Sequence, residues 1–415
     1  MIEVATLRRQ FPALLQRRDE QMPIFLDGPA GTQVPQRTMD AISHYLSSCN
    51  ANKGGAFATS VESDRILQEA HEAMADFVNA PSSKEIVFGP NMTTLTFQIS
   101  RSLAKTWEAN DEILVSRLDH DANVTPWVMA AEDKGVTVRR IDFRPEDCTL
   151  DMDDFKRKLN DRTKLVAVTC ASNLTGSKPN VKAITKMAHD AGALVYLDAV
   201  HYAPHGLIDV QDWDCDFLVC SAYKFFGPHI GILWGKEALL EELPAYQLRP
   251  APQTGPGKWM IGTQNHECIA GVTATIDYIT ELSQWAQTIG MLESRREQLV
   301  QAMWVVQTYE TNLGVQLLHG LSERPDFKVW GITNLENIDQ RVPTISVTHA
   351  KHSPKMMAEH LARRYIYAWS GNNYALTVTE RLDLEDKGGV LRLGLVHYNT
   401  QQEVERVLSA LDELP

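Results

Sequence analysis

Short apolar runs alternate with helix-like segments over much of the chain, between about residues 85 and 235. Several of the apolar runs have no polar alternation, which predicts strands that are buried on both faces. Strands that alternate with helices predict a mostly parallel sheet wrapped by helices. The apolar runs span residues 85–89, 112–116, 136–142, 164–172, 193–200, 216–221 and 231–235.

The helix-like segments between these runs carry recognisable end signals. The pattern at 181–192 finishes at a glycine, which is common at helix C-termini. The stretch 95–107 also has a helical pattern, and it follows the small-residue loop GPNMTT at 89–94. We therefore expect a helix to start just after this loop.

The pattern changes near residue 270 and predicts a second, smaller unit. A long helical pattern at 268–313 leads out of the sheet region, and apolar strands follow near 344–348 and 390–396. The last helix is expected to begin at Thr400, because Thr400 and Glu403 have the spacing of a capping box.

Length and composition agree with two domains. The chain has 415 residues, of which 44% are hydrophobic and 22% charged, as is ordinary for globular proteins. We predict an N-terminal segment that packs with the small domain, a large cofactor-binding domain, and a small α+β domain. Their predicted ranges are residues 1–25, 26–285 and 286–415.

Charge and cysteine usage exclude several function classes. The net charge of −13 disfavours binding to nucleic acid or to anionic membranes. We expect no signal peptide and no membrane helix, since no apolar stretch approaches the roughly 20 residues that a membrane span needs. The six cysteines show no ligand spacing, so neither disulfides nor a metal site is predicted. We expect a cytoplasmic protein.

Polar side chains follow three of the predicted strands. Asn173 comes after the run at 164–172, Asp198 ends the apolar part of the next run, and Lys224 follows the run at 216–221. Functional residues of open parallel sheets gather at the carboxyl ends of the strands. These side chains are therefore expected to converge on one edge of the sheet.

Each of these features has an ordinary interpretation on its own, and their combination favours a cofactor site. Lys224 alone could be a snorkelling surface lysine, and Asp198 alone a turn residue. However, a lysine among aromatic residues has a lowered pKa and can form a Schiff base. A buried aspartate needs a cationic partner, and a helix start after a small-residue loop suits a phosphate. Pyridoxal 5'-phosphate (PLP) offers all three counterparts.

The stretch YLDAVHYAPHGLIDVQDWDCDFLVCSAYKFFGPHIGILWG at 196–235 resembles the lysine region of PLP enzymes of the class V aminotransferase group. It looks most like the cysteine desulfurase and selenocysteine lyase branch. The resemblance extends from FLDGPAGTQVP, which starts at residue 25, to LRLGLVHYNTQQEVERVL, which ends at residue 408. It implies a fold-type I α/β structure with a seven-stranded sheet, PLP as cofactor and an amino-acid substrate.

The resemblance also implies roles for individual residues. Lys224 matches the Schiff-base lysine that moves the substrate proton, and Asp198 matches the aspartate that keeps the pyridine nitrogen protonated. His120 matches the histidine that stacks on the ring, and Asn173 lies near the ring hydroxyl. His201 stands where glutamine is common, and is interpreted as a hydrogen-bond partner of the cofactor, a proton shuttle or a packing histidine.

Further residues match contacts to the phosphate and to the substrate. Gly262 and Thr263 match a phosphate contact from a second subunit, which implies a homodimer with active sites at the interface. Arg392 matches the arginine that binds the substrate carboxylate, a task suited to its planar fork. The phosphate contacts implied within the chain are Met92, Thr93, Ser221 and Tyr223.

One loop departs from the branch that the chain resembles. Tyr374 stands where a desulfurase has its persulfide cysteine, and Trp369 replaces an arginine; Asn373 and Tyr374 are expected to line the substrate site. A phenol does not accept sulfane sulfur, and Cys268 is the last cysteine of the chain. A persulfide relay is disfavoured unless Cys49 or Cys268 comes near the ring.

The favoured hypothesis is a PLP enzyme that cleaves a C–S or C–Se bond by β-elimination without a protein thiol. The alternative is transamination or epimerisation of an amino acid, since both reactions start with removal of the same proton. A true cysteine desulfurase and a non-catalytic PLP-binding protein are less favoured.

Overall fold

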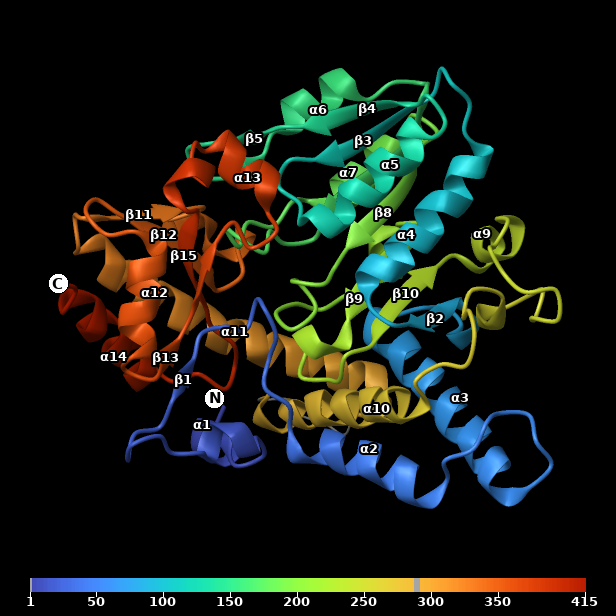
Figure 1. Cartoon of the computed structure of the whole chain (residues 1–415), viewed down its shortest axis with the longest axis horizontal. Coiled ribbons are helices and arrows are strands. Elements are labelled where there is room, and N and C mark those ends of the chain that lie inside the picture. The colour runs from blue at the N-terminus through green and yellow to red at the C-terminus, as the bar shows by residue number, and fades with distance from the viewer. Residues whose placement is uncertain (1, 287–291) are drawn as a thin grey trace.

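The computed structural model describes residues 2–286 and 292–415. It is an α/β protein with a large central sheet and a smaller sheet beside it (Figure 1). The fold class predicted from the sequence is confirmed.

The large sheet contains seven strands, as predicted. Strand β10 runs antiparallel to both of its neighbours, and the other four pairings are parallel. Each strand lies on one of the seven predicted apolar runs. In spatial order the strands are β2 (Ile86–Gly89), β10 (Gly231–Gly235), β9 (Phe217–Ser221), β8 (Leu194–Asp198), β7 (Thr163–Thr169), β3 (Glu112–Ser116) and β4 (Thr137–Ile141).

Helices cover both faces of the large sheet and connect it to the smaller one (Figure 1). The helices of the N-terminal half are α1 (Val4–Arg8), α2 (Gln36–Ser48), α3 (Ala58–Val78), α4 (Met92–Leu103), α5 (Thr125–Glu132), α6 (Met152–Lys158) and α7 (Val181–Asp190). Those that follow are α8 (Val210–Trp213), α9 (Glu237–Glu242), α10 (His266–Glu281), α11 (Arg295–Ser322), α12 (Pro354–Ala362), α13 (Leu376–Arg381) and α14 (Gln401–Asp412).

Consecutive residues of the central strands enter two different cores. In β7, Val166 and Val168 join a cluster with α3, α7 and α10, whereas Leu165 and Ala167 join a cluster with α4 and α5. Because side chains alternate along a strand, a strand covered on both faces is apolar at every position. The unbroken apolar runs are explained by this two-sided burial.

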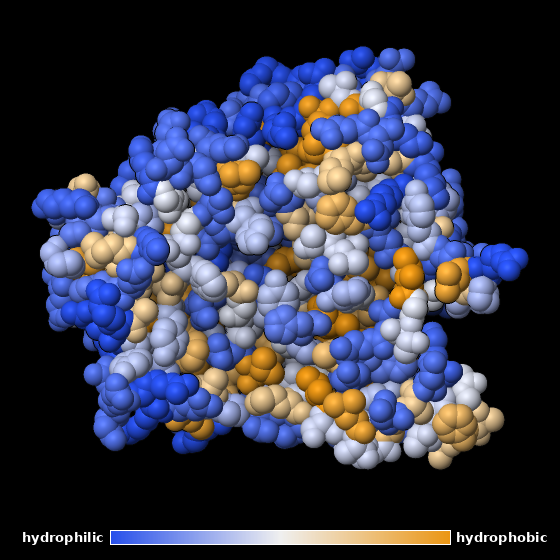
Figure 2. Space-filling model, in the orientation of Figure 1, coloured by the Kyte–Doolittle hydropathy of each residue, from blue (hydrophilic) through white to orange (hydrophobic). Residues whose placement is uncertain are grey.

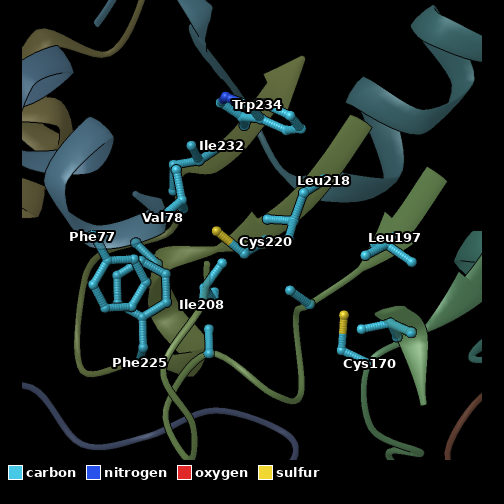
Figure 3. Close-up of a cluster of buried hydrophobic side chains, with 14 of the residues drawn as sticks. Phe77, Val78, Cys170, Leu197, Ile208, Leu218, Cys220, Phe225, Ile232 and Trp234 are labelled. Atoms are coloured by element: carbon cyan, nitrogen blue, oxygen red, sulfur yellow. The ribbon is translucent and has the colours of Figure 1, made fainter. Parts of the chain in front are cut away.

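Figure 3 shows part of the first core, next to the lysine turn. Phe225 stacks on Phe77 of α3, with ring centroids 4.9 Å apart. Phe225 immediately follows Lys224, so one aromatic neighbour of the lysine in the sequence packs into the core and fixes the turn.

Two predicted helices differ from the structure in their bounds. Helix α4 begins at Met92, three residues before the predicted stretch, because the Asn91 side chain caps it by accepting from the Thr94 N–H. The pattern at 268–313 forms two helices, α10 and α11, with a short 3-10 turn after α10. Residues 287–291 of that pattern lie outside the described residues.

The smaller sheet has four antiparallel strands. The predicted strands near 344–348 and 390–396 are confirmed as β12 and β15. In spatial order the sheet is β11 (Phe327–Trp330), β12 (Thr344–His349), β15 (Val390–Gly394) and β14 (Trp369–Gly371). A separate hairpin joins β5 (Phe143–Arg144) and β6 (Thr149–Leu150).

Helix α14 and the N-terminal segment pack at the small sheet. Thr400 and Glu403 form the predicted capping box of α14. Arg8 donates to the carbonyl of Tyr398 at 2.7 Å and pairs with Glu403 at 2.8 Å. Strand β1 (Ile24–Phe25) adds parallel to β13 (Ile366–Tyr367). The division into three segments stays a prediction, although these contacts agree with it.

The face of the molecule seen in Figure 2 is mostly hydrophilic, with separate hydrophobic patches. None of the helices in the described part of the chain is long and apolar enough to cross a membrane.

Candidate functional site

A cavity of about 610 Å³ lies at the carboxyl ends of β7 and β8 and beside the turn that follows β9. The loop after β14 and one residue of β15 close it from the side of the small sheet. Most of the predicted site residues therefore meet in one place, as the strand-end rule requires. Those that line the cavity are Met92, Thr93, His120, Asn173, Asp198, His201, Tyr223, Lys224, Asn373, Tyr374 and Arg392.

Lys224 lies in a 3-10 turn directly after β9. Its Nζ donates to the carbonyls of Pro29 and Ala30 at 2.6 and 2.9 Å. Burial, with a smaller contribution from the positive charge of Arg392, lowers the pKa of Lys224 to about 7, whereas Asp198 opposes the shift. A substantial share of this amine is thus neutral near pH 7 and able to act as a nucleophile or base.

Asp198 ends β8 and is buried. Its Oδ1 accepts a hydrogen bond from the Val200 N–H at 2.8 Å. Burial raises the pKa of Asp198 to about 6, although the Val200 hydrogen bond and the charge of Lys224 favour the ionised form. A buried carboxylate with so little compensation is suited to a cationic partner in the cavity.

His120 provides a neutral ring on the cavity wall. Its Nδ1 accepts from the Ala122 N–H at 3.0 Å, and burial lowers its pKa to about 4. The ring stacks on Tyr374 with centroids 5.3 Å apart and planes at 19°. The carbonyl of Tyr374 also accepts from the Asp121 N–H at 2.7 Å, so the loop after β14 is docked onto the His120 turn.

The start of α4 faces the same cavity. The side chain of Asn91 accepts from the Thr94 N–H at 2.9 Å, and the hydroxyl of Ser221 accepts from the Met92 N–H at 3.0 Å. Thr93, between these two capped positions, lines the cavity. Helix N-termini with partial positive charge are suited to a phosphate.

Tyr223 and Ser221, both interpreted as phosphate contacts, differ in whether they line the cavity. The Tyr223 side chain lines the cavity and stacks on His229 at a centroid distance of 4.9 Å. Ser221 is fully buried and does not line the cavity in the described structure; it acts on α4 through the Met92 N–H.

Asn173 connects the cavity wall to two elements on the side of the small sheet, the loop after β14 and strand β15. Its Nδ2 donates to the carbonyl of Asn373 at 2.8 Å, and its own carbonyl accepts from Arg392 Nη1 at 2.9 Å. Its Oδ1 is buried and has no hydrogen-bond partner within the described residues. Such an atom requires a donor, and a hydroxyl of a bound molecule would supply one.

Arg392 is a buried cation on β15 with one nearby carboxylate. Burial lowers the pKa of Arg392 to about 9, and Asp27 opposes this shift. Burial in turn raises the pKa of Asp27 to about 6. The guanidinium is only partly neutralised by the protein, which makes it suited to a carboxylate in the cavity.

His201 lines the cavity and packs at the same time. Its Nε2 lies 2.9 Å from the Thr344 hydroxyl, and its ring contacts His205 edge-on at 5.3 Å. Burial holds its pKa well below the usual range, so the ring is neutral. These contacts agree with the packing interpretation, whereas a hydrogen bond to the cofactor and a proton-shuttle role stay predictions.

Sequence reasoning missed three supports of the site. The carbonyls of Pro29 and Ala30 hold the lysine amine, and Asp119 accepts from Asn123 Nδ2 at 2.7 Å behind the cavity wall. Burial raises the pKa of Asp119 to about 8, and the charge of Asp198 adds to the shift. The sequence does contain a signal for Asp119, because this carboxylate lies three residues beyond the end of the apolar strand β3.

Gly262 and Thr263 are exposed and lie outside the cavity of their own chain. Their predicted role across a subunit interface stays a prediction. Among the described residues, none of those lining the cavity is a cysteine. Cys49 packs with Tyr45, and Cys268 packs at the edge of the first core, so neither lines the cavity of its own chain.

A mostly parallel α/β sheet with a half-buried lysine after β9 and a buried aspartate at the end of the neighbouring β8 is the arrangement of a fold-type I PLP-dependent enzyme. The chain belongs to the class V aminotransferase family, whose sequence pattern matches residues 24–407. This family consists of PLP-dependent enzymes, and the resemblance inferred from the sequence is thereby confirmed.

Relatives with assigned names point to two activities. A probable cysteine desulfurase of Vibrio cholerae is 31% identical over 99% of this chain and 98% of its own. An aminotransferase-like protein, FGM3, of Gibberella zeae is also 31% identical with the same coverage. The relatives agree on the family but not on the reaction.

Two solved structures that this chain resembles are cysteine desulfurases. The apo enzyme from Thermococcus onnurineus NA1 has a TM-score of 0.87 at 24% identity, and covers 100% of this chain and 98% of its own. The enzyme CsdA (S-sulfonic acid) from Escherichia coli has a TM-score of 0.84 at 25% identity, with the same coverage. These comparisons establish the architecture.

The first prediction concerns the pH at which Lys224 reacts. In cofactor-free protein, an amine-reactive reagent should modify Lys224 with half-maximal rate near pH 7, because its pKa is lowered to about 7 and only the neutral amine reacts. Peptide mass spectrometry measures the extent of labelling. The exposed Lys355, which lies outside the cavity, serves as the control for reagent access. A half-maximal rate for Lys224 near the value of free lysine, about 10.4, would contradict the site electrostatics.

Proposed function

We propose that the chain binds PLP in this cavity and cleaves the C–S or C–Se bond of an amino acid by β-elimination. The observation that carries the proposal is the convergence of Lys224, Asp198 and Arg392 on one cavity that no cysteine of the described residues lines. PLP, when bound, withdraws electrons from the substrate α-carbon and so makes its proton acidic.

The residues present fit PLP at each of its functional groups. The Lys224 amine suits the aldehyde, and the Asp198 carboxylate suits a protonated pyridine nitrogen. The start of α4 at Met92 and Thr93 suits the phosphate. The unpartnered Oδ1 of Asn173 suits a hydroxyl donor, and the neutral ring of His120 presents a flat surface.

Arg392 supports an amino-acid substrate. Its guanidinium is buried beside the cavity, and of the contacts in the described residues it makes one hydrogen bond, to the carbonyl of Asn173. The remaining N–H groups can bind a carboxylate with two parallel hydrogen bonds. A carboxylate held there places the rest of the substrate between Arg392 and the amine of Lys224.

The lowered pKa of Lys224 suits proton transfer at the substrate α-carbon. Near neutral pH a large share of the amine is unprotonated and can accept a proton, which general-base catalysis requires. His120 and His201 are both neutral, because burial lowers their pKa values. They therefore help to orient the bound molecule and do not compete with Lys224 for the proton of the substrate α-carbon.

The position of Tyr374 favours elimination over a persulfide relay. The loop from Trp369 to Tyr374 lines the cavity, and its last residue carries a phenol where the relay needs a thiol. Elimination needs no protein sulfur, because the sulfur leaves with the electron pair of the broken bond. A true desulfurase and a non-catalytic PLP-binding protein are therefore the weaker alternatives.

Transamination or epimerisation is the second candidate, and it is favoured by the family to which the chain belongs and by the aminotransferase-like fungal relative. All three reactions need the same lysine, aspartate and arginine. They differ only in the fate of the substrate after proton removal, so their products separate them.

We also propose a homodimer in which Gly262 and Thr263 contact the phosphate of the neighbouring subunit. Both residues are exposed in the single chain, and Ile261 beside them is 52% exposed although it is apolar.

The second prediction tests the reaction. With cysteine the holoenzyme should form pyruvate, ammonia and sulfide in equal amounts, and with selenocysteine pyruvate, ammonia and selenide, without added thiol; amino acids without a leaving group on the β-carbon should form none of these. Lys224→Ala should lower turnover by about 10²–10⁴-fold, the usual contribution of a general base. Lys355→Ala is the matched control and should retain full activity.

Three products would contradict elimination. Alanine formed together with transferable sulfur would indicate a desulfurase. Pyridoxamine phosphate would indicate transamination, and inversion at the α-carbon would indicate epimerisation.

The third prediction concerns the carboxylate anchor. Arg392→Ala should weaken amino-acid binding by about 2–5 kcal/mol, the range for truncating one member of a buried charge pair. It should also abolish the preference for a substrate over its carboxamide, since the carboxamide lacks the charge. Kd values from calorimetry measure both effects, and Arg364→Ala, which removes a more exposed arginine paired with Glu413, is the control. An unchanged preference would locate the carboxylate elsewhere.

A further inference from the structure

Two large aromatic side chains stand exposed at the mouth of the cavity. Trp369 is 54% exposed and Tyr374 is 72% exposed, and both line the cavity. We call these two residues the aromatic rim. Large apolar groups that stay exposed beside a binding cavity mark a surface that a ligand or a partner covers.

The backbone fixes Trp369 next to the proposed carboxylate anchor. In the antiparallel pairing of β14 with β15, Trp369 lies directly opposite Arg392. Residues that face each other in this way have side chains on the same face of the sheet, about 4.5–5.5 Å apart at Cβ. A substrate whose carboxylate is bound by Arg392 therefore has Trp369 beside it.

Tyr374 is docked on the turn that carries His120. Its ring stacks on His120 with a centroid distance of 5.3 Å, and its carbonyl accepts from the Asp121 N–H at 2.7 Å. The backbone at Asn373 and Tyr374 has positive φ angles of 52° and 60°. The ring contact and the hydrogen bond thus place the tyrosine at the cavity, although most of its side chain stays exposed.

The mouth carries no formal charge between these two rings. Residues 369–374 read Trp-Ser-Gly-Asn-Asn-Tyr, and the charged groups that line the cavity, Asp198, Lys224 and Arg392, lie on other segments. Free cysteine has no group beyond its sulfur to contact the rim. A thioether of cysteine has one, and an uncharged aromatic or aliphatic substituent is what two aromatic rings would bind.

We propose that the substrate is a cysteine thioether whose sulfur carries an apolar or aromatic group that packs against the aromatic rim. This inference rests on the elimination proposed above and names its substrate class. The rim then acts as the specificity determinant, while Lys224 and Arg392 act on the part that all amino acids share.

The reaction balances without an oxidant, a reductant or a sulfur acceptor. The Cα–H bond breaks and its proton passes to Lys224 Nζ; the Cβ–S bond breaks and its electron pair leaves on sulfur as a thiolate, which is then protonated. The three-carbon enamine that remains takes up one water and yields pyruvate and ammonium. The thiol product needs no protein cysteine, in agreement with the cavity lining.

The fourth prediction compares S-benzylcysteine with S-methylcysteine as substrates of the holoenzyme. Trp369→Ala and Tyr374→Ala should each lower kcat/KM for S-benzylcysteine by about tenfold, mainly through KM, because one aromatic contact is lost. The value for S-methylcysteine should fall by a smaller factor, so that the preference for the benzyl compound is lost, since a methyl group does not span the rim. Tyr374→Phe should keep the wild-type preference, because it keeps the ring. Trp304→Ala, which removes a tryptophan of α11 that is 58% exposed, is the matched control.

An equal loss for both thioethers, or a wild-type preference for free cysteine, would overturn the inference. So would rim variants that change the subunit mass in analytical ultracentrifugation but leave the substrate preference intact, since the rings would then cover a second chain. If no compound yields pyruvate, the elimination itself is refuted, and the rim is judged by Kd alone: S-benzylcysteine should still bind more tightly than S-methylcysteine, and only in proteins that keep both rings.

Discussion

The site depends on packing that shields the Lys224 amine from solvent and still gives it hydrogen-bond acceptors. Lys224 is half-buried just beyond the end of β9, and the carbonyls of Pro29 and Ala30 accept its hydrogen bonds. The N-terminal segment reaches this position because the Thr32 N–H donates to the Tyr223 carbonyl at 3.0 Å. Two neutral acceptors satisfy the donors of the amine but do not compensate a full charge, so the pKa falls. Reactivity thus follows from how distant segments pack around a single turn.

The second constraint is that the cavity spans the two sheets. The segment at Asn173 accepts from Arg392, and the Ser346 hydroxyl donates to the Leu174 carbonyl at 2.5 Å. Asn173 in turn donates to Asn373 in the loop that carries the aromatic rim. The cofactor-facing wall and the substrate-facing loop therefore meet through one short segment. A substitution in the small sheet is therefore expected to affect Arg392 and the proposed carboxylate site more than it affects Lys224.

The sequence predicted the features that are local along the chain. Apolar runs located all seven strands of the large sheet, and their ends located Asp198 and Lys224. The break after α10 was missed, because the apolar spacing continues through it. The acceptors at Pro29 and Ala30 and the stacking of Tyr374 on His120 were also missed. These contacts join residues that are far apart in the chain, and no local pattern encodes them. The resemblance supplied the roles of the residues, whereas the structure supplied their distances and burial.

The central claim is that Lys224 is the residue to which PLP is attached. The most direct measurement is borohydride reduction of the purified holoenzyme, followed by peptide mass spectrometry to locate the pyridoxyl group. The account predicts a single modified lysine, Lys224, and complete loss of the modification in Lys224→Ala. A pyridoxyl group fixed on another lysine, or no fixed group in protein that contains PLP, would contradict it.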